Sequence, residues 1–519
     1  MSARFLLPVP VVLPLIGAAL CLVVHRRPAV QRALAVGIVG GVLAASVALL
    51  VLVESEGTVA TDIGGWAAPI GITLVGDLFA AIMLVISVAM VFAVLLYAIA
   101  SPSADDSTFF HPVYLILAAG VGASFLTGDL FNLFVAFEIM LTASYVLITL
   151  GGSRAQVRAA MTYIVISLVA STLFVTAVGL LYAATGTVNM ADLADKVAEL
   201  PSGLRSALGL LLLVVFGIKA AIFPLFFWLP DSYPTAPSPV TAIFAGLLTK
   251  VGVYAIIRTQ TLLFPSDGPA TLLLVVAGAT MVVGILGAIA QEDIKRILSF
   301  NLVSHIGYMI MGLGLYTVAG LAGAVLYIVH HIVVKTTLFL VSGLIEHTRG
   351  TAALQRLGGM ARSAPLIAAL FLLPALSLAG VPPLSEFVAK LALVQAGVGV
   401  GSWAIVTVSL AVSALTLFSM IKIWNGVFWG PTPEEEGEAG PVGAEPLGTA
   451  GADAVALAVR HDAGVVHRRA PVGMWAPVAG LVVLSLVIAG ASGPIYHLAE
   501  RAAAGLLDPS AYVEEVLDR

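Results

Sequence analysis

Five of the chain's seven lysines lie inside apolar stretches that are long enough to cross a membrane. These five are Lys219, Lys250, Lys335, Lys390 and Lys422. Burying a charged side chain at the centre of a bilayer costs roughly 2.5–3.5 kcal/mol on insertion scales, so chance is a poor explanation for five of them. Lysines in such positions usually carry protons or bind ions, and this is the chemistry that the sequence first indicates.

One lysine and one glutamate lie too deep in their predicted spans to reach water. Lys219 is about 14 residues from one end of its span, which is about 20 Å and beyond the reach of a lysine side chain. Glu138 is similarly deep within TGDLFNLFVAFEIMLTASYVLITL. A carboxylate that approaches and leaves Lys219 would switch the proton occupancy of the lysine. The alternatives are a fixed ion pair at Lys219 and a neutral, hydrogen-bonded acid at Glu138.

Three further candidates, His330, His331 and Lys335, share the segment LAGAVLYIVHHIVVKTTLFLVSGLIEH. His331 and Lys335 are one helical turn apart and face the same way, so they could be successive stations of a proton relay. A metal site is the rival interpretation of paired histidines. Adjacent residues diverge on a helix, however, and no acidic or thiol ligand lies at ligand spacing. His305, in FNLVSHIGYM, is equally consistent with a proton carrier and with a core histidine.

The remaining lysines differ in their depth and in their neighbours. Lys250 is about 12 residues into its span, whereas Lys422 is about 7 residues, or about 10 Å, from an end and could snorkel. Lys390 follows an interruption and can pair with Glu386, one turn before it. We expect a proton path along the membrane plane through Glu138, Lys219, Lys250, the His330/His331/Lys335 group and Lys390.

The composition is that of a polytopic membrane protein built from helices. Hydrophobic residues make up 60% of the 519 residues and charged residues only 10%, and the mean hydropathy is +1.07. Because a spanning helix needs about 20 mainly apolar residues, we predict an all-α fold with about 14 transmembrane helices. The predicted spans are residues 4–24, 33–53, 75–100, 112–127, 130–150, 157–184, 205–229, 238–259, 269–290, 295–314, 318–345, 363–397, 403–429 and 473–497.

Basic residues give the expected orientation, because cytoplasmic loops carry the excess of Lys and Arg. With the N-terminus outside, the inner loops hold thirteen basic residues and the outer segments hold six. The acidic loop 54–70 has no basic residue and fits the outside. Arg26 and Arg27 follow the first apolar run, which argues against a signal peptide. We therefore expect a multi-pass protein of a prokaryotic cell membrane with both termini on the outer side.

Motifs that would mark other classes of protein are missing. The single cysteine, Cys21, rules out disulfides and cysteine-ligated iron–sulfur clusters within the chain. We find no Walker A loop and no dinucleotide-binding GxGxxG motif. We expect no cofactor, no metal and no nucleic-acid partner, so the driving energy must come from an ion gradient or from a partner subunit.

Two predicted spans are interrupted by prolines and polar residues, within 217–239 and 374–387. Broken helices are tolerated at membrane depth only where protein or a water-filled cavity satisfies the backbone. The spacing between lysines also suggests a duplication, since the interval from Lys219 to Lys250 nearly equals that from Lys390 to Lys422. Glu138 and His305 are separated in the sequence by nearly the same number of residues as the two lysine pairs, so they would correspond in the duplication. Two inverted five-helix repeats, a known transporter plan, would explain both features.

The expected organisation has five parts. They are N-terminal helices 1–3 in residues 1–111, a first repeat in 112–259, a second repeat in 269–429, a cytoplasmic linker in 430–472, and helix 14 with a C-terminal tail in 473–519. The tail contains a possible short amphipathic helix.

Four segments resemble the antiporter-like subunit family shared by multisubunit Mrp-type Na+/H+ antiporters and respiratory complex I. They are TGDLFNLFVAFEIMLTASYVL, GIKAAIFPLFFWLPDSYPTAPSPVTAIFAGLLTKVGVY, EDIKRILSFNLVSHIGYM and LAGVPPLSEFVAK. The first segment is most similar to the D-type subunits of Mrp antiporters. Only about 22 residues follow the last predicted span, which argues against the large A-type subunits and their complex I counterpart, whose members append a long lateral helix. The first segment alone separates the D type from the medium-sized complex I subunits.

The resemblance implies a fourteen-helix fold with discontinuous helices 7 and 12. It implies that Glu138 and Lys219 form a coupling pair, that Lys250 is the central lysine and that Lys390 is the exit lysine. It also implies assembly with membrane subunits of the A, B, C, E, F and G types. Protons would move through this chain, and Na+ would cross in this subunit or elsewhere in the complex.

Three functions are compatible with these observations. The first is a proton-translocating subunit of a monovalent cation/proton antiporter, which is a secondary transporter and not an enzyme. The second is a proton-pumping subunit of complex I or of a membrane-bound hydrogenase, which would depend on NADH, ferredoxin or hydrogen instead of Na+. The third is a scaffold whose ion pairs only specify packing, in which case exchanging Glu138 and Lys219 would restore function.

Overall fold

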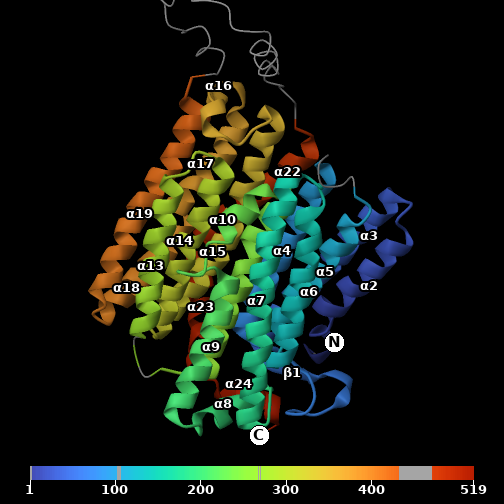
Figure 1. Cartoon of the computed structure of the whole chain (residues 1–519), viewed down its shortest axis with the longest axis vertical. Coiled ribbons are helices and arrows are strands. Elements are labelled where there is room, and N and C mark those ends of the chain that lie inside the picture. Colours follow the sequence, from blue (N-terminus) through green and yellow to red (C-terminus); the bar gives the residue numbers. More distant parts are fainter. Residues whose placement is uncertain (1–2, 102–106, 267, 269, 432–469, 519) are drawn as a thin grey trace, which may run out of the picture.

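Long apolar segments form the body of the molecule as helices, because a bilayer offers no water to unpaired backbone groups. The computed structural model describes residues 3–101, 107–266, 268, 270–431 and 470–518. Within these residues, eleven helices are long and apolar enough to cross a membrane, and three shorter apolar helices join them (Figure 1). Each of these fourteen coincides with one predicted span, so the all-α polytopic fold is confirmed.

The crossing segments follow one another along the chain with mostly short connections. They are α2 (Val9–Val23), α3 (Pro28–Glu56), α4 (Leu78–Ala100), α5 (Phe110–Leu126), α6 (Leu130–Thr149), α7 (Arg154–Thr185), α9 (Ser202–Ala220), α11 (Ser238–Ile243) with η3 (Phe244–Leu248) and α12 (Thr249–Leu262), α13 (Thr271–Ile289), α14 (Ile294–Gly314), α15 (Val318–Arg349), α17 (Pro365–Ala379) with α18 (Ser385–Gly399), α19 (Trp403–Trp424) with η5 (Asn425–Trp429), and α22 (Val472–Gly490). The short elements are α1 (Ala3–Leu6), η1 (Ile63–Gly65), α8 (Met190–Ala198), α10 (Leu229–Ser232), η2 (Tyr233–Thr235), η4 (Leu354–Arg356), α16 (Met360–Ser363), α23 (Ser492–Leu507) and α24 (Ser510–Leu517).

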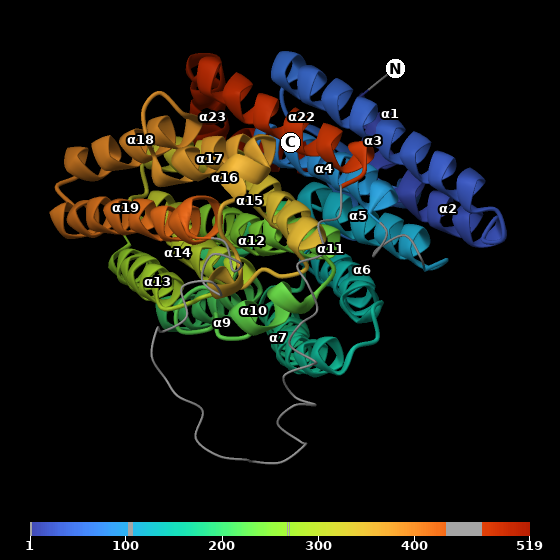
Figure 2. The ribbon, with the colours of Figure 1, turned by 90° about the horizontal axis from the view of Figure 1, so that it is seen from above.

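The centre of the bundle is α15, whose residues from Gly320 to Ile345 are all buried. It packs against α4, α11, α14, α17, α18, α22 and α23 (Figure 2). A helix that is buried on every side meets protein in place of lipid. This position allows α15 to carry His330, His331 and Lys335 at membrane depth.

The first interruption ends α9 shortly after Lys219. Ala221 adopts a left-handed conformation with φ 61°, which a non-glycine residue rarely takes. Polar groups near the break are paired with protein. The amide of Phe223 donates to Thr280 Oγ1 at 3.0 Å, and the indole of Trp228 donates to a carbonyl of α9 at 3.1 Å. These contacts satisfy backbone that would otherwise be unpaired inside the membrane.

The second interruption separates α17 from α18 at residues 380–384. Gly380 has a φ of 78°, a conformation that favours glycine. Side chains bind the carbonyls at the end of α17, with Lys390 Nζ and Ser413 Oγ each donating to one of them at 3.2 Å. Both of the predicted discontinuous helices, 7 and 12, are therefore present.

The two interruptions lie differently with respect to their lysines. Lys219 precedes its break, whereas Lys390 follows its break and lies on the second half of the interrupted helix. The two breaks, at Ala221 and Gly380, are therefore closer together in the sequence than Lys219 and Lys390 are. The spacing that treats these lysines as repeat equivalents does not match the register of the breaks. The division into inverted repeats at residues 112–259 and 269–429 stays a prediction.

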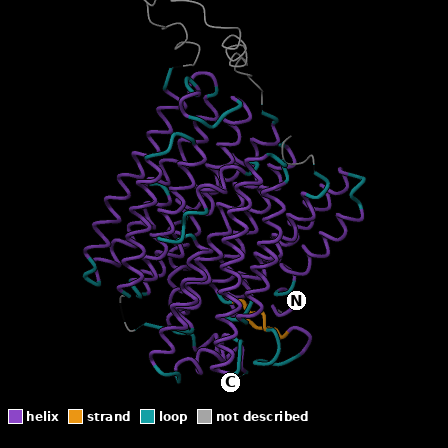
Figure 3. The backbone as a smooth tube through the Cα atoms, in the orientation of Figure 1, coloured by secondary structure: helices purple, strands orange, loops and turns teal. Residues whose placement is uncertain are grey.

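The end of the molecule that holds the acidic loop contains structure that the sequence did not predict. Strands β1 (Val59–Asp62) and β2 (Thr73–Gly76) pair antiparallel around this loop (Figure 3). Helices α1 and α24 both pack against β1, so the first and last described elements lie on the same side of the bundle. The last predicted span, 473–497, continues as α23 to Leu507. The predicted linker 430–472 lies mostly outside the described residues.

Candidate functional site

Lys219 and Glu138 are linked through a serine. Lys219 is on the last turn of α9, Glu138 is on α6, and Ser171 is on α7. Lys219 Nζ donates to Ser171 Oγ at 3.0 Å and to the carbonyl of Ser167 at 3.4 Å. The Ser171 hydroxyl in turn donates to Glu138 Oε1. Because a hydroxyl can donate and accept at once, Ser171 can connect the ammonium to the carboxylate.

A void the size of one water molecule also touches Lys219. Its volume is about 10 Å³, and its lining includes Tyr163, Trp228, Tyr233 and Leu248. The Tyr233 hydroxyl is buried and has no hydrogen-bond partner within the described part of the chain. Lys219, Ser167 and Tyr233 supply polar groups to its otherwise largely apolar lining, and a void of this volume is just large enough for one water. Such a water would lie between Lys219 and η3, which ends two residues before Lys250.

Lys250 is fully buried at the start of α12, next to a widened helical turn. The preceding segment η3 is π-helical, and Lys250 Nζ donates back to the carbonyl of Ala245 at 2.6 Å. π-helical turns occur frequently at functional sites. Further along α12, a Cβ atom at Gly252 would lie 2.6 Å from the amide nitrogen of Ala220. Glycine therefore lets α12 pass close to the end of α9, which brings the helices of Lys219 and Lys250 together.

His305, His331 and Lys335 form a buried centre between α14 and α15. The imidazole rings of His305 and His331 are 5.1 Å apart, and Lys335 Nζ donates to the carbonyl of Leu298 on α14 at 3.2 Å. Among the described residues, both ring nitrogens of His331 and Nε2 of His305 lack a hydrogen-bond partner. Helix α15, which carries His331 and Lys335, also packs against η3, the segment before Lys250. An imidazole nitrogen without a fixed partner is available to accept or release a proton.

Glu386, on the first turn of α18, is fully buried and collects four polar side chains. Its carboxylate lies 2.8 Å from Lys390 Nζ, 2.8 Å from His330 Nε2 and 3.3 Å from His305 Nδ1. Tyr327 donates to the same carboxylate at 3.0 Å and lies 2.6 Å from His305 Nδ1. The predicted contact of Glu386 with Lys390 is confirmed. Basic groups and hydroxyl donors of this kind are what a buried carboxylate needs.

Two serines complete this cluster. Ser385 Oγ lies 2.6 Å from His330 Nδ1, so both nitrogens of His330 are engaged. Ser413 Oγ accepts from Lys390 Nζ at 3.0 Å. His330 therefore faces α18 while His331 lies beside His305 on α14, and the predicted divergence of the adjacent histidines is confirmed.

Lys422 lies apart from the groups around Lys219 and Glu386. Its ammonium donates to the carbonyls of Ile289 and Gln291 at 3.0 and 2.7 Å, and it lies 2.6 Å from Glu292. The carbonyl of Ile289 ends α13 and that of Gln291 follows it, and a cation is favourable at the C-terminal end of a helix. The side chain of Lys422 is 23% exposed, which agrees with the snorkelling alternative, and it links α19 to the end of α13.

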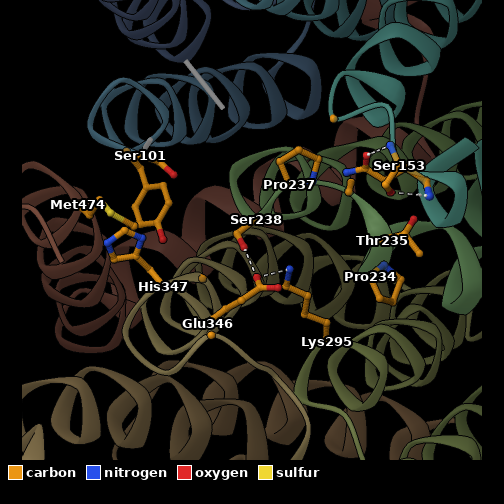
Figure 4. Close-up of a pocket in the computed structure, with 16 residues that line it drawn as sticks. Ser101, Ser153, Pro234, Thr235, Pro237, Ser238, Lys295, Glu346, His347 and Met474 are labelled. Carbon is orange, nitrogen blue, oxygen red and sulfur yellow. Dashed lines mark hydrogen bonds and ion pairs between the residues drawn. The ribbon is translucent and has the colours of Figure 1, made fainter. Parts of the chain in front are cut away.

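A polar cavity of about 630 Å³ lies at the end of the bundle that carries the basic loops (Figure 4). Glu346, near the end of α15, lies 2.6 Å from Lys295 Nζ and accepts from Ser238 Oγ at 2.9 Å. Lys295 is buried, whereas the side chain of Glu346 is 41% exposed. Tyr97 and His347 also line the cavity. The sequence had indicated only that Lys295 is an inner-loop residue.

A family model covers the ionisable groups from Glu138 to Lys390. The transmembrane family described as NADH:quinone oxidoreductase/Mrp antiporter, TM matches residues 127–416. The matched range is more than half of the chain. It contains every residue of the group around Lys219 and of the group around Glu386. The chain belongs to this family.

Two curated relatives match almost the full chain. A protein of Alkalihalophilus pseudofirmus, named as the D subunit of a Na(+)/H(+) antiporter, is 42% identical over 512 residues, which is 98% of each chain. The protein of the same name from Bacillus subtilis is 36% identical over 518 residues, again covering 98% of each chain. The resemblance read from the four sequence segments is therefore confirmed.

Two solved structures share the fold throughout. A chain of the Mrp complex from Dietzia sp. DQ12-45-1b superimposes with a TM-score of 0.89 at 36% identity, with 100% of both chains covered. A chain of the membrane-bound sulfane sulfur reductase, an archaeal respiratory membrane complex, superimposes with a TM-score of 0.85 at 26% identity. It covers 99% of this chain and 100% of the other.

The sequence did not predict that hydroxyl groups connect the charged residues in this member of the family. They are Ser167, Ser171, Tyr327, Ser385 and Ser413. Serine and tyrosine are common in transmembrane helices, so their presence carries little signal. The only available signal was their spacing, since Ser167 and Ser171 are one helical turn apart.

Proposed function

We propose that this chain is the proton-translocating subunit of a multisubunit monovalent cation/proton antiporter of the Na+/H+ type. It acts as a secondary transporter and not as an enzyme. The observation that carries the proposal is a row of ionisable groups from the half-buried Glu138 to the buried Lys390, in a chain similar over its full length to proteins named as D subunits of Na(+)/H(+) antiporters.

The row divides into three stations, to which we assign successive roles. Glu138 and Lys219 are the coupling pair, connected by Ser171. Lys250, Lys335 and His331 form the central station, and the Lys219 void is the step toward it. The cluster of Glu386 with His305, His330 and Lys390 is the third station, with Lys390 as the exit lysine. A change in the contact between Lys219 and Glu138 moves one proton to the centre and onward, because charge interactions are strong where water is excluded.

The cavity beside Glu346 and Lys295 is the cytoplasmic entry to this row. It is polar and lies among loops that hold most of the basic residues. Ser342 lies one turn before Glu346 on α15, in the direction of Lys335. Ser342 and Glu346 therefore share a face of the helix. Ser342 Oγ is buried without a partner among the described residues.

The chain works within a complex in the cell membrane of a prokaryote, with both termini on the outer side. Its partners are membrane subunits of the A, B, C, E, F and G types. Protons pass through this chain, and Na+ crosses in it or elsewhere in the complex. Similarity over full length to a chain of an Mrp complex supports this assembly.

A second candidate is a proton-pumping subunit of a redox-driven complex, such as complex I or a membrane-bound hydrogenase. The shared family and the similarity to a chain of an archaeal respiratory membrane complex favour it. The identity to that chain is 26%, against 36% to the chain of the Mrp complex. The antiporter is therefore the preferred function.

The deciding experiment measures exchange in everted vesicles. The chain is expressed with its operon neighbours in a host that lacks its own antiporters, and Na+ is added to vesicles that hold a respiration-generated pH gradient. We expect Na+ to collapse the gradient. No collapse, in vesicles that contain the assembled complex, would transfer the assignment to the redox-driven pump.

Two lysine variants separate proton transfer from packing. Lys219→Ala should abolish exchange while the complex remains assembled, and Lys422→Gln should retain exchange because that lysine binds Glu292 and the end of α13, apart from the row. Wild-type exchange by Lys219→Ala would contradict the role of the coupling pair. Restored exchange in the double variant Glu138→Lys and Lys219→Glu would support the scaffold alternative instead.

A further inference from the structure

A separate cavity of about 400 Å³ lies at the end of α9 that is remote from the cytoplasmic loops. It is bounded by α9, by the end of α12 and by the start of α13. Leu210 and Leu272, which line it, are 48% and 51% exposed. The cavity therefore opens onto the apolar outer surface of the bundle, where lipid would meet it, and lies apart from the ionisable row.

Polar and apolar groups are segregated along this cavity. Arg205 and Ser206 are on the first turns of α9, whereas Leu213 is about 8 residues further along, or about 12 Å deeper. Gly209 lies between them, and a Cβ atom there would be 3.0 Å from the Phe264 ring. The cavity thus has a polar mouth at the membrane surface and an apolar floor, which is the profile of a membrane lipid.

Two hydrogen-bond donors at the cavity are unused by the protein. Gln260 Nε2 is buried without a partner, and Arg205 makes no ion pair, in both cases counting only residues that the structure describes. A buried donor without an acceptor costs about 1–3 kcal/mol, so an acceptor from a ligand would be favourable here. Among the described residues, those that line the cavity include no acid. An amine on the ligand would therefore find no carboxylate partner among them.

We propose that this cavity binds one anionic phospholipid. The phosphodiester accepts from Arg205 and Gln260, and one acyl chain lies along Gly209, Leu213 and Phe264. A zwitterionic headgroup binds more weakly because its ammonium has no counter-charge among the described lining residues. This site is independent of the proposed proton path, and its test needs no exchange measurement.

The test titrates the purified, delipidated complex with dioleoyl phosphatidylglycerol and counts bound lipid by native mass spectrometry. We expect one tight site, with affinity reduced about tenfold or more in Arg205→Gln, since a hydrogen bond to a charged group contributes about 1.5–3 kcal/mol. Lys196→Gln removes an equal charge from the neighbouring helix α8 and should leave this site intact. Dioleoyl phosphatidylcholine should not compete for it.

A second variant tests the apolar floor without changing charge. Leu210→Trp places a large side chain into the cavity from an exposed position and should also remove the tight site. Equal phosphatidylglycerol binding by wild type and both variants overturns the proposal. So does the absence of a tight site in the wild-type complex, which would mean that a neighbouring protein of the complex covers this cavity.

Discussion

At the scale of single residues, hydroxyl groups decide which charged side chains communicate. Ser171 stands between Lys219 and Glu138, and Tyr327 touches both His305 and Glu386. Neither hydroxyl is ionised at neutral pH, so each adds a hydrogen-bond donor and acceptor without adding charge. Removing them tests the connections of the row while its charges stay in place.

Ser171→Ala should lower cation/proton exchange about tenfold, because a hydrogen bond to a charged group contributes about 1.5–3 kcal/mol and about 1.4 kcal/mol is a factor of ten. Exchange is measured in everted vesicles, with complex content checked by immunoblot. Ser171→Thr keeps the hydroxyl and is the matched control. Equal activity in the two variants would show that this hydroxyl is dispensable.

Tyr327→Phe should slow exchange by a similar factor, because it removes the hydroxyl between His305 and Glu386. The matched control is Tyr308→Phe. Tyr308 stacks on Tyr327 with ring centroids 5.2 Å apart, but its hydroxyl donates to the carbonyl of Ser409. If the Tyr308 variant loses as much exchange as the Tyr327 variant, the loss does not depend specifically on the connection to Glu386.

At the scale of elements, each interrupted helix places a lysine close to its break. Lys390 can bind the end of α17 because the chain stops and restarts at residues 380–384, and Lys219 lies on the last turn before the other break. The prolines near both breaks predicted them from sequence. The sequence also placed Lys390 after its break, but the residues at which each helix ends and resumes were not predictable, because proline spacing does not specify where helical geometry resumes.

Gly380→Ala should impair exchange more than it impairs stability. Gly380 has a left-handed φ of 78°, and a Cβ atom there would lie 3.0 Å from Lys390 Cδ and 3.3 Å from Nζ. The backbone strain is about 1–2 kcal/mol, and the new methyl group also pushes on the lysine. Thermal unfolding and vesicle exchange are measured together.

Gly401→Ala is the control for the strain alone. Gly401 has a similar φ of 69°, and nothing lies within 4 Å of a Cβ atom placed there. We expect both variants to lose a similar amount of stability and only Gly380→Ala to lose exchange. Similar exchange in the two variants would mean that the position of Lys390 tolerates this displacement.

At the scale of the whole molecule, burial of α15 on every side shields the row from lipid. The most buried helices, α11 to α12, α14 and α15, carry Lys250, His305 and the His330/His331/Lys335 group. Helices at the periphery, such as α7, are much less buried and face the membrane or other subunits. The ionisable groups thus lie where a membrane protein can best hold them.

The orientation is a testable property of the whole chain. In a Cys21→Ser background, we expect a membrane-impermeant maleimide to label Ser153→Cys in everted vesicles and Ser202→Cys in right-side-out vesicles. Ser153 lines the cavity beside Glu346, and Ser202 begins α9 at the opposite end. The physical reason is the excess of Lys and Arg in cytoplasmic loops. The reverse pattern of labelling would place both termini inside the cell.

The sequence by itself determined the number of crossing segments and the residues that must be buried. Apolar runs of about 20 residues leave few alternatives in a membrane, because only helices satisfy their own backbone there. The same runs identified Lys219, Lys250, Lys335 and Lys390 as residues that need a function or a partner. The i, i+4 spacing of Glu386 and Lys390 was enough to predict their contact, since helical neighbours meet whatever the tertiary fold.

Only the tertiary structure decided which distant residues meet. Glu386 joins His305 from α14 and His330 from α15, and Ser171 of α7 joins Lys219 of α9 to Glu138 of α6. These contacts depend on the rotation and axial position of each helix. A helix that is apolar all round, such as α15, gives no periodic signal for its rotation. Packing against its neighbours sets that rotation, and the contacts of the row follow from it.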